Sequence, residues 1–111
     1  MPDEDRKRAA HRALVDRLLH GDGKASAQDR ARAFHNNGLT PPLDALIAKV
    51  ADSPTQVSAA DLAAAKASGR TEDQLFELVV CAAVGRSTRL YEAGLTALPE
   101  AMLKEGPGNA T

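Results

Sequence analysis

Two residues that could do chemistry, Glu77 and Cys81, stand four residues apart in one apolar run, Leu75 to Val84. On a helix that spacing puts both side chains on one face, where a carboxylate either exchanges a proton with the thiol or raises its pKa. A buried free cysteine also behaves as a small hydrophobic side chain, and this core interpretation is favoured for Cys81. A lone acid among apolar residues must be paired or face a cavity. We therefore expect Glu77 to pair with an arginine, within the chain or across an oligomer interface.

Two arginines follow this run, Arg86 and Arg89, three residues apart and next to two hydroxyl side chains. Such a pair could bind a carboxylate or a phosphate in a pocket. It has neither a glycine-rich loop nor a helix N-terminus beside it to add backbone amides. Pairing with Glu92 or Glu77 is therefore the favoured interpretation. The candidate ligand-binding residues are Glu77, Cys81, Arg86 and Arg89.

Other chemistries lack the residue patterns that they need. The histidines His11, His20 and His35 are widely spaced and have no acid or thiol nearby in a metal-ligand pattern, so we expect neither a metal nor another cofactor. Residues 63–84 have the outline of a helix-turn-helix, but the second helix would expose almost no polar side chain to base edges. The formal charge of −1 also gives no positive excess for binding nucleic acid.

Composition predicts one small domain that self-associates. A chain of 111 residues is expected to form a single domain with a modest core. Only 3% of the residues are aromatic, and the apolar 43% is mainly Ala, Leu and Val. Small side chains bury little area each, at about 25 cal/mol per Å², so a lone protomer would be marginally stable. We therefore expect a homo-oligomer.

The cellular setting is predicted from the cysteine count and the hydropathy. A single cysteine excludes a disulfide within the chain and is typical of a reducing compartment. The charged start of the chain is not followed by the apolar segment of a signal peptide. The longest apolar run is too short to span a membrane. We expect a soluble, cytoplasmic protein without a membrane partner.

Helical periodicity and capping residues predict an all-α, single-domain bundle of five or six helices. Ser26, Thr40 and Ser58 are N-cap residues that precede amphipathic stretches, and Gly69 ends the helix that Ser58 starts. Thr71 opens a further capping box before the apolar run. The predicted helices span residues 3–20, 26–37, 41–52, 58–68, 71–84 and 86–98, within one domain of residues 1–111 and ahead of a flexible tail at 104–111.

The last two predicted helices follow each other directly, which raises a question of length. Uninterrupted from residue 71 to residue 98, they would measure about 42 Å, longer than a compact domain of this size is wide. We expect either a break near Gly85 or a protruding end used for assembly. Pro99 is expected to stop the helix. The apolar run before Gly85 is expected to be covered on most sides and to form the centre of the fold.

The order of elements around Gly69 resembles a known family. Residues 65–78, Ala-Lys-Ala-Ser-Gly-Arg-Thr-Glu-Asp-Gln-Leu-Phe-Glu-Leu, place a helix, a glycine, an acidic cap and an apolar helix in succession. This succession resembles the second half of the alkylhydroperoxidase D-like, or carboxymuconolactone decarboxylase-like, helical family, over about Leu43 to Leu98. The resemblance implies the helical fold of that family.

Redox-active members of the family carry a C-x-x-C-x-x-x-H motif before this glycine and a glutamate further upstream. The family's spacing puts the cysteines at Pro54 and Val57, the histidine at Asp61 and the glutamate near Ile47. A thiolate that attacks a peroxide needs a resolving thiol and a base, and neither is retained. The resemblance therefore implies a degenerate member without hydroperoxide reductase activity. The decarboxylase branch does not depend on a cysteine pair, so its proton-transfer chemistry stays open.

Three functions follow as hypotheses. The first is a non-catalytic or accessory helical protein that self-associates and binds a partner protein or a small ligand. The second is a small-molecule enzyme of the carboxymuconolactone decarboxylase-like type, in which Glu77 with Arg86 or Arg89 transfers a proton on a carboxylated substrate. The third makes Cys81 a one-thiol peroxidatic site. The missing redox residues favour the first.

Overall fold

The computed structural model describes residues 2–104, which form helices and connecting loops with no strand among them. The elements are α1 (Pro2–His20), α2 (Ala27–His35), α3 (Leu43–Asp52), the 3-10 helix η1 (Pro54–Gln56), α4 (Ala59–Ala67) and α5 (Glu72–Lys104). The all-α prediction is confirmed. α1, α2, α3 and α4 start and end within two residues of the predicted bounds. Of the predicted tail at 104–111, Lys104 belongs to α5 and the rest lies outside the described residues.

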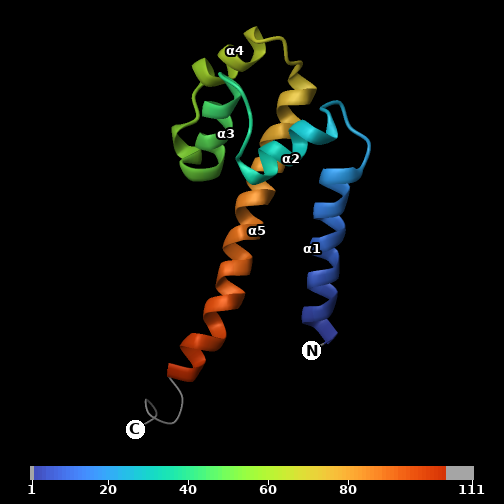
Figure 1. Ribbon diagram of the computed structural model, residues 1–111, viewed down its shortest axis with the longest axis vertical. Helices are drawn as coiled ribbons and strands as arrows, with labels where there is room; N and C mark the ends of the chain where they lie inside the picture. Colours follow the sequence, from blue (N-terminus) through green and yellow to red (C-terminus); the bar gives the residue numbers. More distant parts are fainter. Residues whose placement is uncertain (1, 105–111) are drawn as a thin grey trace.

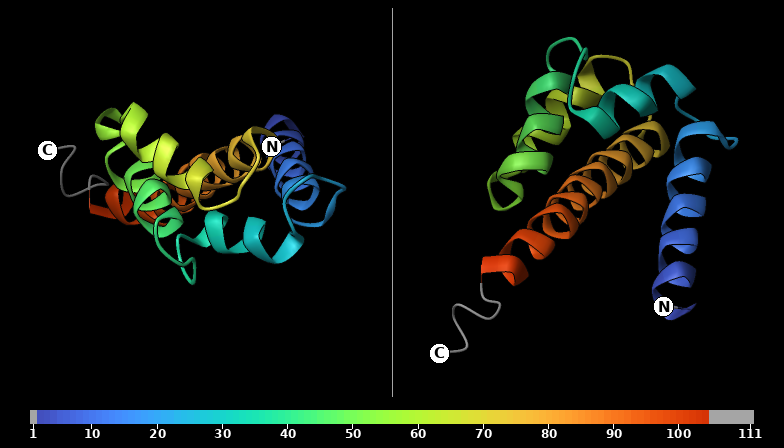
Figure 2. Two further views of the ribbon diagram at one scale, coloured as in Figure 1. Left: turned by 90° about the horizontal axis from the view of Figure 1, so that it is seen from above. Right: turned by 60° about the horizontal axis from the view of Figure 1, so that its bottom comes forward.

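The helices form an elongated molecule with its core at one end. α2, α3 and α4 gather around the first half of α5, while α1 and the second half of α5 extend away from this cluster (Figures 1 and 2). α2 makes the most extensive contact with α5, and α3 the next. The molecule measures 61 × 28 × 20 Å, and its buried apolar cluster draws only on residues 25–82. The largest fully buried side chains are Leu46, Ile47, Leu78 and Cys81.

Side-chain caps start α2, α4 and α5 where the sequence predicts them. Ser26 Oγ accepts a hydrogen bond of 3.0 Å from the backbone N–H of the third residue of α2. Ser58 and Asp61 form a complete capping box at the start of α4. Thr71 and Gln74 do the same for α5, because each side chain accepts a hydrogen bond from the backbone N–H of the other. These local contacts explain why the bounds of the helices are readable from the sequence.

α3 begins later than predicted. The expected start was Pro41, after a Thr40 cap, but the helix begins at Leu43 with Pro42 in the N-cap position and no side-chain cap. A residue that precedes a proline is disfavoured in the helical conformation. Pro41 precedes Pro42, so it is kept out of the helix.

α5 is one continuous helix where the sequence predicts two. It runs from Glu72 to Lys104 without a break at Gly85, and Pro99 lies inside it. Gly85 serves a close approach instead, because a Cβ built on it would lie 1.9 Å from the carbonyl oxygen of Phe34 in α2. Pro99 removes one helical hydrogen bond, but near the exposed end of the helix water can bond the carbonyl group that is left free. At about 50 Å the helix protrudes from the core (Figure 1), as the alternative expectation had it.

The apolar run at the start of α5 is buried on one side only. Leu75, Leu78 and Cys81 are buried, whereas Phe76 is 71% exposed and Ala83 is exposed as well. The expectation that this run is covered on most sides is therefore wrong. α2 and α3 pack against one side of α5, and within the described part of the chain no helix covers the opposite side.

Candidate functional site

Glu77, in the second turn of α5, holds the loop between α1 and α2. Its Oε1 accepts a hydrogen bond from Lys24 N at 2.7 Å, and its Oε2 accepts one from Ala25 N at 2.5 Å. The loop comes closest at Gly23, where a Cβ would lie 2.8 Å from Glu77 Oε1. Within the chain the expected arginine partner is therefore wrong, because backbone amides satisfy the carboxylate. Their position in a distant loop leaves no signal in the sequence around Glu77.

These contacts set the charge of Glu77. Burial raises the pKa of its carboxyl group, but the hydrogen bonds from Ala25 and Lys24 and the positive charges of Arg30 and Lys24 outweigh it, so the net pKa is lowered. The carboxylate is therefore ionised at neutral pH. A group that transfers protons needs a pKa near the working pH, and the shift takes Glu77 away from that range.

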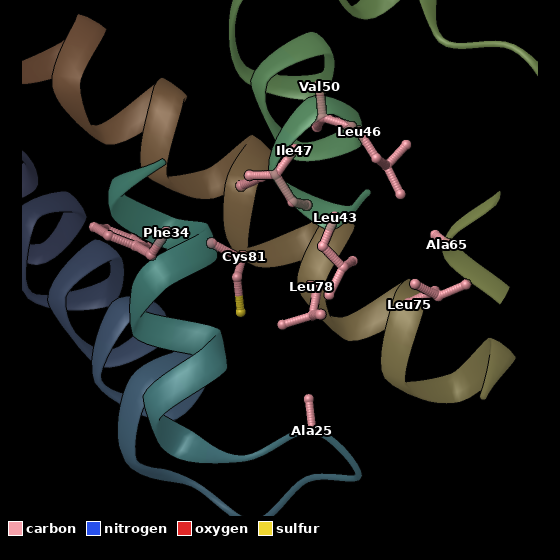
Figure 3. Close-up of a cluster of buried hydrophobic side chains, with 12 residues drawn as sticks. Ala25, Phe34, Leu43, Leu46, Ile47, Val50, Ala65, Leu75, Leu78 and Cys81 are labelled. Atoms are coloured by element: carbon pink, nitrogen blue, oxygen red, sulfur yellow. The ribbon is translucent and has the colours of Figure 1, made fainter. Parts of the chain in front are cut away.

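Cys81 lies one turn further along α5, with 0% of its surface exposed. Figure 3 shows it in the core cluster together with Phe34 and Leu78. Burial raises the pKa of the thiol, and this effect exceeds the lowering by the positive charge of Arg30. A neutral, inaccessible thiol is a poor nucleophile. These features support the core interpretation over a peroxidatic site.

Arg86 and Arg89 each bond the C-terminal end of another helix. Arg86 Nη1 donates a hydrogen bond to the carbonyl oxygen of Ala51 in α3 and lies 3.9 Å from Asp52 Oδ1. Arg89 Nη1 donates a hydrogen bond of 2.7 Å to the carbonyl oxygen of Phe34 in α2. The last carbonyl groups of a helix lack helical partners and carry partial negative charge, which a guanidinium satisfies. The expected pairing with Glu92 or Glu77 is therefore wrong.

A hollow of about 250 Å³ opens beside Glu77 and Cys81, between α1, the loop after it, α2 and α5. The two residues share its wall, as their spacing predicts, whereas Arg86 and Arg89 do not line it. Of the four candidate residues, the structure therefore brings only Glu77 and Cys81 together, while Arg86 and Arg89 each contact a different helix. The other residues of the wall are Arg17, Leu18, Asp22, Arg30, Phe76 and Val80.

Arg30 is the residue of this hollow that sequence reasoning missed. It is only 7% exposed, its Nη1 donates a hydrogen bond of 3.0 Å to the carbonyl oxygen of Leu18, and its Nε is buried without a hydrogen-bond partner. Its charge lowers the pKa of both Glu77 and Cys81. In the sequence it is one of several charged residues in a polar stretch, and nothing beside it signals burial.

Phe76 separates this hollow from a second one of about 340 Å³, which lies between α4 and α5. Leu62, Leu75 and Val79 supply its apolar wall. Lys66 Nζ and Glu72 Oε1 also line this hollow and form an ion pair at 2.7 Å. An exposed aromatic ring with a hollow on each side is the most prominent apolar feature of this end of the molecule.

The positions at which the family resemblance would place redox residues belong to the scaffold. Pro54 begins η1 and Val57 is its C-cap, while Ile47 is fully buried in the core. Asp61 caps α4, and its Oδ2 pairs with Lys49 Nζ at 2.9 Å. Each of these residues has a structural role, and none bears a thiol or an imidazole.

Two further properties bear on the kind of function. Within residues 2–104, no cluster of three or more His, Cys, Asp or Glu side chains is placed to hold a metal ion. None of the helices in this described range combines the length and the apolar character that crossing a bilayer requires.

Comparison with known proteins yields no match to a protein-family model, to a curated protein or to a solved structure. Function must therefore be inferred from the geometry of the described residues.

Proposed function

We propose that this chain is a non-catalytic, accessory helical protein that self-associates and binds a small ligand or a partner protein. The observation that carries the proposal is the use of Glu77, Arg86 and Arg89 as contacts to backbone groups of three different segments. No two of them remain together to transfer a proton. Apolar side chains such as Phe76 stand exposed beside them, and an exposed apolar surface favours binding.

The hollow between α1 and α5 is the ligand site of this proposal. Phe76 and Val80 supply apolar surface, Arg17 and Arg30 supply positive charge, and Asp22 adds a carboxylate besides that of Glu77. The carboxylate of Glu77 is already bonded to the loop. A small ligand with an apolar body and an acidic group suits this combination.

The enzyme hypothesis, a proton transfer of the carboxymuconolactone decarboxylase-like type, requires Glu77 and an arginine in one pocket. Glu77 faces the loop after α1, whereas Arg86 and Arg89 bond the ends of α3 and α2. No observation favours this alternative over binding.

We also propose kinship with the alkylhydroperoxidase D-like family at the level of the fold. In support, α4 ends just before Gly69, which has a φ of 105°, and Thr71 then caps α5 in the order on which the resemblance depends.

The single cysteine is buried and free, which suits a reducing compartment such as the cytoplasm.

Gel filtration with multi-angle light scattering tests self-association. The protomer mass is 11.7 kDa, and we expect at least twice that mass at tens of micromolar protein. The midpoint of thermal unfolding should also rise with protein concentration. A mass of one protomer throughout this range would refute self-association.

Ligand binding is tested separately with a set of small aromatic and aliphatic carboxylic acids. We expect chemical-shift changes in the NMR signals of residues around Val80. Arg17→Glu, which replaces a positive charge of the wall with a negative one and leaves the apolar residues of α5 unchanged, is the matched control and should abolish the changes. Equal changes in both proteins would show that the acids bind elsewhere.

A further inference from the structure

One side of α5 carries no charged residue for about 33 Å. Apolar or small residues recur on it every three or four positions, the spacing that keeps side chains on one side of a helix and lets two helices pack along their length. We call this set the open face of α5. It consists of Phe76, Val80, Ala83, Ser87, Leu90, Gly94 and Leu98.

The open face is accessible along its whole length. Phe76 is 71% exposed, Leu90 60% and Leu98 56%. Of the other four residues three are exposed, and Val80 is half-buried. The opposite side of the helix carries core residues such as Leu78 and the contact with α2. α5 is thus a helix with two apolar sides, only one of which has a neighbour within the described part of the chain.

Gly94 gives a second, independent indication of a missing neighbour. A glycine in a helix interior costs about 1 kcal/mol relative to alanine. At Gly85 the protomer itself requires glycine, since a Cβ would lie 1.9 Å from the Phe34 carbonyl oxygen. At Gly94 no atom lies within 4 Å of the place where a Cβ would be. The protomer does not require glycine there, whereas a second helix packed on the open face approaches more closely over a glycine.

We propose that two copies of this chain pair through the open face of α5, with their α5 helices antiparallel and a two-fold axis at Ser87. This proposal rests on the self-association proposed above and names its surface. About that axis, Phe76 meets Leu98 of the partner subunit, and Val80 meets Gly94 of the partner subunit. Ser87 meets its own copy.

The antiparallel arrangement makes the face self-complementary, which a closed two-fold dimer requires. Val80 lies opposite a glycine, and Ala83 lies opposite Tyr91 of the partner subunit, a side chain that is 41% exposed. In both of these pairs a larger side chain opposes a smaller one, as close packing demands. A parallel pair in register would instead place Phe76 against its own copy and leave a gap where two Gly94 residues face each other.

The flanks of the face add to the area that α5 alone can bury. A helix about 10 Å wide and a face about 33 Å long give about 330 Å² on α5 alone. Stable interfaces bury about 800 Å² on each partner. The two hollows on either side of Phe76 bring Leu62 of α4 and Leu18 of α1 to the rim of the face. A second helix laid on the face therefore also contacts α4 and α1.

Two alanines of α5 provide a matched test. Ala83 lies on the open face and Ala93 outside it, and both are exposed. By light scattering at tens of micromolar protein, we expect Ala83→Glu to have the protomer mass, because two glutamates would be buried near the axis without partners. Ala93→Glu should keep the mass of the unmodified protein. Leu90→Glu is a second variant of the face, and circular dichroism verifies that each variant is folded.

The outcomes separate this surface from self-association in general. An unmodified chain that is oligomeric, with Ala83→Glu and Leu90→Glu equally oligomeric, overturns the proposed surface and leaves self-association standing. An unmodified chain that is monomeric overturns both, and the open face is then available to a helix of a different protein.

Cysteine cross-linking tests the axis and the direction of the helices. Cys81 is buried, so under mild oxidation we expect Ser87→Cys to form a covalent dimer and Ala93→Cys to remain uncoupled. A dimeric Ser87→Cys protein that fails to cross-link overturns the position of the axis. Phe76→Cys and Leu98→Cys chains should cross-link to each other when mixed. Efficient cross-linking of Phe76→Cys to itself would overturn the antiparallel direction.

Discussion

The two halves of α5 are continuous in structure but differ in what surrounds them. From Glu72 to Thr88 the helix packs against α2, α3 and α4 and supplies much of the core. From Arg89 to Lys104 it extends away from this cluster. Beyond Arg89, α1 lies beside this half: the ring of His11 is 5.6 Å from that of Tyr91, and α1 lines a hollow with α5 as far as Thr96. An isolated helix of this length is marginal in water. Packing thus holds the first half, whereas the second half is helical because it continues the first.

The two glycines of α5 express this difference most directly. Gly85 lies in the first half, where a missing Cβ admits the backbone of α2. Gly94 lies in the second half, where the missing Cβ admits nothing within the protomer. The effects of substitutions along the helix on the free energy of unfolding should therefore decline from the packed half to the extended one.

The largest effect is expected for Gly85→Ala. Its methyl group would overlap the carbonyl oxygen of Phe34, so α2 must move away from α5 or α5 must distort. Both atoms belong to packed backbone, and overpacking of this kind costs about 3 kcal/mol. Urea unfolding followed by circular dichroism measures the loss. A loss below about 0.5 kcal/mol, the range of ordinary surface substitutions, would show that α2 and α5 do not cross this closely.

A smaller effect is expected for Glu77→Gln. The amide offers one acceptor to the loop and turns an NH₂ group toward the second backbone N–H, so we expect a loss of about 2 kcal/mol at neutral pH. A control for the close approach at the loop is the double variant Glu77→Ala with Gly23→Ala. It removes the carboxylate and places the methyl group of residue 23 in the space that the carboxylate leaves.

The effect of Glu77→Gln should depend on pH. The pKa of Glu77 is lowered in the folded chain, so its contribution to stability is full above the unfolded value of about 4.3 and is lost as the pH falls through the folded value. Urea unfolding of both proteins at a series of pH values gives the difference in their stability. That difference should stay constant above about pH 5 and shrink below it. A difference that grows on acidification would mean that the folded pKa is raised.

Whether a feature of the fold or of the site could be predicted from the sequence depends on how far apart in the sequence the contacting residues lie. Caps at Ser58 and Thr71 join residues three apart, so the starts of α4 and α5 were predictable, as was the all-α class. Glu77 and Cys81 share the wall of one hollow because their spacing on a helix dictates it.

Contacts between distant segments could not be predicted. Arg86 and Arg89 bond carbonyl oxygens that are 35 and 55 residues away, and an orphan carbonyl at a helix end leaves no residue type to recognise. The break expected at Gly85 was wrong for the same reason, since the close approach of Phe34 is visible only in three dimensions. Arg30 was missed because burial of a charged side chain depends on neighbours from other helices.

A still smaller loss is expected at Arg89, which stands at the border of the two halves. Arg89→Met keeps the aliphatic part of the side chain and removes the hydrogen bond to the Phe34 carbonyl oxygen, which is 2.7 Å long. We expect a loss of about 1 kcal/mol, because Arg89 is exposed as a residue and water partly replaces its hydrogen bond. Glu92→Gln, one turn further on, is the control and should stay within about 0.5 kcal/mol of the unmodified protein. Equal losses of stability in Arg89→Met and Glu92→Gln would mean that the hydrogen bond from Arg89 to the end of α2 contributes nothing specific.

The smallest effect, and one of opposite sign, is expected for Gly94→Ala. Alanine is the better helix former by roughly 0.5–1 kcal/mol, and the protomer offers no atom for its methyl group to meet, so the isolated chain should gain about 0.5 kcal/mol. The gain is best measured in the Ala83→Glu background, where the proposed dimer is absent, by amide hydrogen exchange in the second half of α5. In the unmodified background the same methyl group would meet Val80 of the partner subunit and weaken the dimer. A methyl group that slows exchange in the monomer and lowers the dimer fraction would thus show that Gly94 serves the contact between copies. A loss of protection in the monomer would instead reveal a neighbour within the chain, and the contrast between the two halves of α5 would disappear.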